Sequence, residues 1–111
     1  MRIGGGEKAA GGWVAVFTRR HKLVLSPTDD PALFDLDSDP FEMTNLFHDS
    51  ARRGVIRDLA NELKNYLATS GDPHAKSAPV MADISWAVSP AAEYSPPARE
   101  KARRARAERE D

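Results

Sequence analysis

The side chains most capable of taking part in a reaction lie between Leu33 and Leu46, in the run L-F-D-L-D-S-D-P-F-E-M-T-N-L. Carboxylates at close spacing can serve acid–base chemistry, but only where a cleft positions a substrate between them. Here the Asp39-Pro40 pair is typical of a turn, in which the carboxylate accepts backbone amides two residues further on. We therefore interpret this acidic segment as a structural turn.

The other chemically capable residues are scattered. The chain has no cysteine, which excludes disulfides, thiolate metal sites and cysteine nucleophiles. Its three histidines are His21, His48 and His74, and none forms an H-x-x-x-H metal spacing. No metal site and no catalytic residue is therefore predicted in these 111 residues.

Three short β-rich runs precede one amphipathic segment. Residues 13–17 (WVAVF) and 22–25 (KLVL), separated by a polar break, are predicted to form a hairpin, and residues 33–36 a third strand. A helix is predicted over residues 50–69, with Asp49 or Ser50 as the N-cap and Gly71 able to end it in the left-handed conformation. Its apolar residues fall at steps of three and four, namely Val55, Ile56, Leu59, Leu63, Tyr66 and Leu67.

The two ends differ in composition from the centre. Residues 1–12 are predicted to be a flexible Gly-rich N-terminus, residues 13–73 a folded module, and residues 74–111 a mostly disordered Pro/Ala/Arg-rich tail. Within the tail we expect at most a short strand over residues 81–88 and a helix over residues 98–109. The predicted fold class is α+β, a small antiparallel sheet packed against one long C-terminal helix, with disordered N- and C-terminal tails.

Residues 13–17 do not alternate between apolar and polar, and residues 23–25 repeat that pattern. One helix covers one face of a sheet, so the second face would expose a Trp or a Phe, which small soluble monomers avoid. We expect a partner outside this chain to cover it. The alternative is that Ile84, Trp86 and Val88 fold back over that face.

From about Trp13 to Pro73 the chain resembles the C-terminal subdomain of the sulfatase family, sulfuric ester hydrolases of the alkaline-phosphatase-like superfamily. There an R-x-K-L strand precedes L-[FY]-D-L-x-x-D-P-x-E-x-x-N-L and a helix. His21 departs from the aromatic residue usual in the family. The matching residues are Arg20, Lys22, Leu23, Leu33, Phe34, Asp35, Leu36, Asp39, Pro40, Glu42, Asn45 and Leu46.

The resemblance implies a detached subdomain that packs on a catalytic domain and is not catalytic alone. Calcium and the formylglycine nucleophile would belong to the missing N-terminal domain. Ser95 to Arg99 reads S-x-P-A-R, like the formylglycine motif, but it lies in the tail and lacks the rigid surround a nucleophile needs. By the same resemblance His21, Lys22 and His74 are candidates for a substrate rim, since such groups suit sulfated sugars.

Composition limits the partners. The net charge is −1, and the tail beyond residue 98 carries six basic and four acidic residues with no aromatic among them, so nucleic-acid binding is not expected. No apolar run approaches ~20 residues, so no membrane contact is expected. No signal peptide is evident, and the sequence does not assign a cellular compartment. The expected partner is the sulfatase N-terminal domain or, if the chain is an independent interaction module, another protein that docks on the exposed sheet face.

Overall fold

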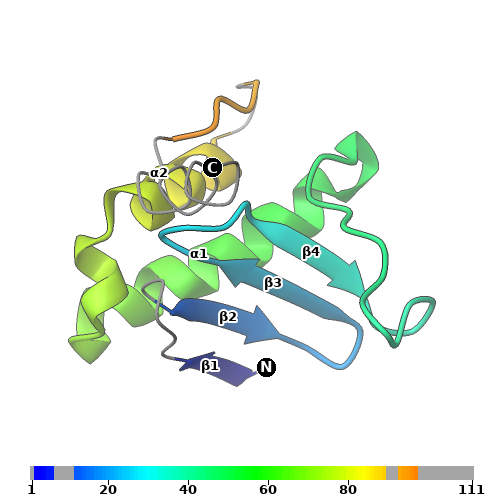
Figure 1. Ribbon diagram of the computed structural model, residues 1–111, viewed down its shortest axis with the longest axis horizontal. Helices are drawn as coiled ribbons and strands as arrows, with labels where there is room; N and C mark the ends of the chain where they lie inside the picture. The colour runs from blue at the N-terminus through cyan, green and yellow to red at the C-terminus, as the bar shows by residue number, and fades with distance from the viewer. Residues whose placement is uncertain (1, 7–11, 90–92, 98–111) are drawn as a thin grey trace, which may run out of the picture.

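The computed structural model describes residues 2–6, 12–89 and 93–97. Four strands form one antiparallel sheet in the order β1-β2-β3-β4 (Figure 1). The α+β class is confirmed. The strands are β1 (Arg2–Gly6), β2 (Trp13–Phe17), β3 (His21–Leu25) and β4 (Ala32–Asp35).

Two helical segments follow the sheet. The first consists of a 3-10 turn, η1 (Ser50–Arg52), and the helix α1 (Arg53–Ser70). Asp49 caps it by accepting from the backbone N–H of Ala51 at 3.0 Å, and Gly71 ends α1 with a φ of 76°. The second consists of a 3-10 turn, η2 (Pro73–Lys76), and the helix α2 (Ala78–Val88).

The strand predicted over residues 81–88 is wrong, because this segment is helical. Ser77 caps α2 by accepting from the backbone N–H of Val80 at 3.4 Å, and Pro79 stands in the first turn, where its missing N–H costs nothing. Val80, Ile84 and Ala87 are buried at helical spacing. The alternation of apolar residues was therefore a coincidence in a short, mostly apolar run, which periodicity alone cannot assign to a strand or a helix.

Two boundary predictions also need correction. Part of the supposedly flexible segment 1–12 is strand β1, which pairs with β2 from Arg2 opposite Phe17 to Gly6 opposite Trp13. The supposed tail 74–111 contributes η2 and α2, so the sheet carries two helices and not one. The helix predicted over residues 98–109 lies outside the described residues.

The core lies between the sheet and the helices. Val14, Val16, Leu23, Leu25 and Leu33 point from the sheet toward the helices and are almost fully buried. They meet the buried stripe of α1 and the stripe of α2, and α2 packs alongside α1 (Figure 1). Because Ile84 belongs to this core, α2 does not fold back over the second sheet face as the alternative required.

We expect Leu63→Ala to lower the free energy of unfolding by about 2–5 kcal/mol, because Leu63 is fully buried at the centre of the α1 stripe. Urea denaturation checks this. Lys64→Ala is the matched control, since the neighbouring Lys64 side chain is exposed on the same helix. If both variants lose the same free energy of unfolding, Leu63 does not belong to the core as described.

Candidate docking surface

The sheet has one face that neither helix covers, and we call it the outer face. It consists of the residues that alternate with the buried strand positions, namely Trp13, Ala15, Phe17, Val24, Ala32 and Phe34, with Arg2 and Lys22 at one end. Ala15 is fully buried among them, whereas Trp13, Phe17 and Phe34 keep part of their surface exposed.

The strand register arranges the outer face in rows. Phe17, Lys22 and Phe34 lie opposite one another across β2, β3 and β4. The next row is Ala15, Val24 and Ala32, whose small side chains form a shallow floor between larger neighbours. The guanidinium of Arg2 lies 4.6 Å from the centre of the Phe17 ring and extends the first row with a cation. The face is therefore apolar at its centre and basic at one end.

A buried carboxylate lies at the end of the sheet where β3 begins. The Asp35 side chain is 2% exposed, and Arg20 donates to it from Nε at 3.3 Å to each oxygen and from Nη2 at 3.0 Å. The backbone N–H groups of Asp37 and Ser38 also donate to Asp35, and Arg52 lies 4.0 Å away. These hydrogen bonds, the one from Arg20 above all, lower the pKa of Asp35 to about 2 although burial opposes the change.

The loop from Asp37 to Asn45 is held by its own polar side chains. Asp39 accepts from the backbone N–H groups of Met43 at 2.9 Å and Thr44 at 2.8 Å. Asn45 accepts from the N–H groups of Leu33 and Phe47 and donates to the carbonyl of Pro31, each at 3.0 Å. The acidic segment thus makes the structural contacts of a turn.

The structure does not bring the three predicted rim residues together. Lys22 lies on the outer face and donates to Glu42 at 2.8 Å. His21 is its neighbour on β3, with its Nε2 buried and without a hydrogen-bond partner among the described residues, and burial lowers its pKa. His74 bonds Asp72 at 2.8 Å in η2, which packs on the helices at the side away from the β2–β3 turn.

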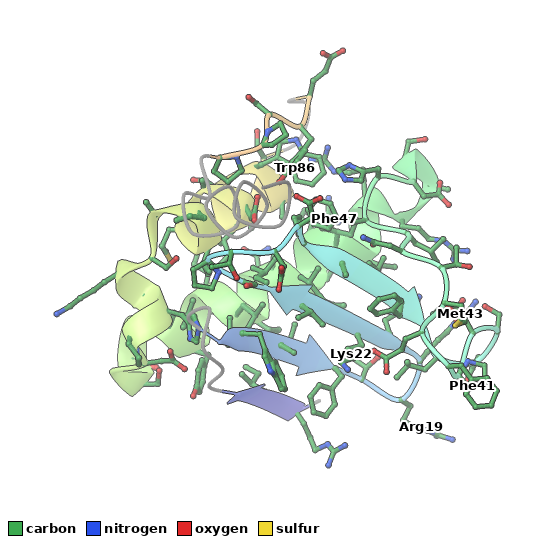
Figure 2. All side chains as sticks on the ribbon, in the orientation of Figure 1. Arg19, Lys22, Phe41, Met43, Phe47 and Trp86 are labelled. Carbon is green, nitrogen blue, oxygen red and sulfur yellow. The ribbon has the colours of Figure 1, made fainter. Side chains whose placement is uncertain are left out.

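A hollow of about 310 Å³ lies on the helical side. Its aromatic rings lie with centres 5.0 to 5.4 Å apart, and Tyr94 meets Phe47 and Trp86 edge-on. Phe47 and Trp86 are tilted by 40° to each other, and Figure 2 shows them side by side. Arg53 stacks 3.8 Å from the Trp86 ring centre and donates at 2.7 Å to the carbonyl of Ser89. We interpret this cluster as the joint between the helices. The lining residues are Phe47, His48, Ser50, Arg53, Trp86, Glu93 and Tyr94.

Sequence reasoning missed two exposed apolar side chains. Phe41 is 84% exposed and Met43 is 82% exposed. Both occupy variable positions of the D-P-x-E-x-x-N-L pattern, where a large apolar residue between turn-forming polar residues is itself a signal. The S-x-P-A-R match is only partly described, because Ala98 and Arg99 lie outside the described residues.

Comparisons with known proteins add no assignment: no family model and no curated protein matches the chain. Among the described residues no three His, Asp or Glu side chains converge as a metal ion would require. No helix in the described part of the chain is long and apolar enough to cross a membrane.

The Asp35 ion pair predicts an acid-dependent stability. Because folding lowers its pKa from 3.8 to about 2, its contribution is complete above about pH 4 and is lost as the pH falls toward 2. We expect Asp35→Asn to lower the urea midpoint clearly at pH 6 and hardly at pH 2. Asp37→Asn, the same charge change at an exposed position, should have little effect at either pH. If the urea midpoint of Asp35→Asn is still clearly below that of the unmodified chain at pH 2, the stabilisation by Asp35 does not come from its ion pair.

Proposed function

We propose that this chain is the C-terminal subdomain of a sulfatase-like sulfuric ester hydrolase and that its outer face docks on the catalytic domain. The observation that carries the proposal is the outer face itself, with three aromatic side chains on one side of a sheet whose helices both lie on the other. Burying apolar surface at about 25 cal/mol per Å² makes such a face favourable to cover.

The contacts between motif residues support the family part of the proposal. Four polar residues of the R-x-K-L and L-F-D-L-x-x-D-P-x-E patterns form two ion pairs between the two patterns: Arg20 with Asp35, and Lys22 with Glu42. Asn45 bonds the backbone of Leu33 within the second pattern. The residues that carry the resemblance therefore form one contiguous unit, as residues of a shared structural motif should.

In this proposal the subdomain supplies packing and the partner supplies the chemistry. The nucleophile and the calcium ion belong to the catalytic domain. His21 and Lys22, neighbours at the end of β3, are the candidates for a contact with substrate, and His74 is too remote from them to share one rim. Lys22 already neutralises Glu42, which reduces the charge it can offer to a sulfate group.

The test begins with the coding sequence next to this chain. We expect it to encode, in frame or after a frameshift, a domain with the C-x-P-[SA]-R or S-x-P-[SA]-R formylglycine motif. That domain, co-expressed with the 111-residue chain, should co-purify with it and hydrolyse an aryl sulfate. The chain alone should not.

Phe34→Asp should lower the affinity of the complex at least about tenfold, because it places a carboxylate in the covered face. Asn61→Asp adds the same charge on the exposed side of α1 and should leave the affinity unchanged. If no such catalytic domain is encoded nearby, the proposal fails and the outer face is better explained by an independent interaction module.

A further inference from the structure

The loop from Asp37 to Asn45 presents two large apolar side chains to solvent. Phe41 is 84% exposed and Met43 is 82% exposed, and no other large apolar side chain of the described residues is comparably exposed. Figure 2 shows both at the end of the sheet where Arg19 also lies. Apolar side chains exposed to this extent do not stabilise the folded chain. We therefore look for the role of Phe41 and Met43 in a contact with another molecule.

Hydrogen bonds within this loop hold its backbone in place. Asp39 holds the backbone N–H groups of Met43 and Thr44 with its carboxylate and that of Glu42 with its carbonyl. Glu42 itself takes a φ of 56°, the left-handed region that non-glycine residues seldom occupy, and this places Phe41 and Met43 on either side of the bend. Backbone strain maintained by surrounding hydrogen bonds is typical of contact sites. The backbone that carries both side chains is therefore preorganised, which lowers the backbone entropy lost on binding.

The loop is also joined to the outer face. The Lys22–Glu42 ion pair links the bend to the row of Phe17, Lys22 and Phe34. At the same end of the sheet, Arg19 is exposed at the β2–β3 turn and has no ion-pair partner among the described residues. A body that covers the outer face at this end would meet Arg19, Phe41 and Met43 at its margin.

We infer that Phe41 and Met43 are an anchor pair that inserts into an apolar pocket of the same partner that covers the outer face, with a partner carboxylate facing Arg19. The inference rests on the proposed function in one respect, namely that the outer face is covered by a partner domain. Beyond the proposed function, it names the two side chains that bind the partner most strongly. Large aromatic and Met side chains with a neighbouring Arg are the composition of such interface anchors.

Photo-crosslinking in cells of the source organism tests this. A benzoylphenylalanine is placed in the full chain at Phe41, at Phe34 on the outer face, or at Lys64 on the exposed side of α1 as the control. Irradiation is followed by peptide mass spectrometry of the captured chain. We expect the Phe41 and Phe34 positions to capture one and the same polypeptide, and the Lys64 position not to capture it.

A variant without the anchor gives the second measurement. Phe41→Ser combined with Met43→Ser should lower capture from the Phe34 position at least about tenfold. Its melting temperature should equal that of the unmodified chain, because neither side chain is buried. A clear drop in melting temperature would show that the two residues serve the fold, and would overturn the inference.

The outcomes separate the two proposals. Capture from Phe34 alone, or of different polypeptides from Phe34 and Phe41, overturns the anchor and leaves the docking face. Capture of one polypeptide from both positions that lacks the formylglycine motif overturns the sulfatase assignment. The anchor is then supported only by the loss of that capture in the variant with Phe41→Ser and Met43→Ser, and is overturned if the capture persists. Capture from Phe41 alone, or from neither position, overturns the inference together with the outer face as the docking surface.

Discussion

The ion pair between Arg20 and Asp35 joins parts of the chain that would otherwise have little reason to stay in place. Asp35 ends β4, Arg20 precedes β3, and Arg52 approaches from the start of the long helix. A carboxylate with 2% of its surface exposed must be paired, because a lone buried charge costs several kcal/mol. Here backbone N–H groups and two guanidinium groups meet that demand. The requirement sets where the sheet stops and where the acidic loop departs from it.

The second constraint is the geometry of two layers. A four-stranded sheet has two faces, and α1 with α2 alongside it can bury only one of them. The opposite face carries Trp13, Phe17 and Phe34, which are partly exposed, so the fold leaves an apolar surface that neither helix covers. The proposed catalytic-domain partner would cover this apolar face. It also explains why the exposed end of the sheet combines aromatic rings with arginine and lysine.

The loop that follows β4 connects these two constraints. Its polar side chains fold back on backbone N–H groups, while its apolar side chains point outward. That is the reverse of an ordinary surface loop, in which apolar side chains turn inward. The Lys22–Glu42 pair then fixes the loop beside the outer face. The hydrogen-bonded side chain of Asp39 and the most exposed large apolar residues of the described chain thus belong to the same stretch of sequence.

Local patterns in the sequence were sufficient for much of this. Three strands were predicted to within a residue or so, as were the long helix and its left-handed end at Gly71, because β-rich runs, helical spacing and a glycine cap act through near neighbours. The surplus apolar face was also visible, since strand residues point alternately to two faces.

Tertiary structure decided what depends on distant partners. Arg2–Gly6 became a strand because β2 offered an edge to pair with, and the helix Ala78–Val88 buries Val80 and Ile84 in the core that it shares with α1. The proximity of Lys22 to Glu42, the distance of His74 from both, and the exposure of Phe41 and Met43 depend on how the chain folds back. No local propensity encodes such contacts, because their free energy arises between residues far apart in the sequence.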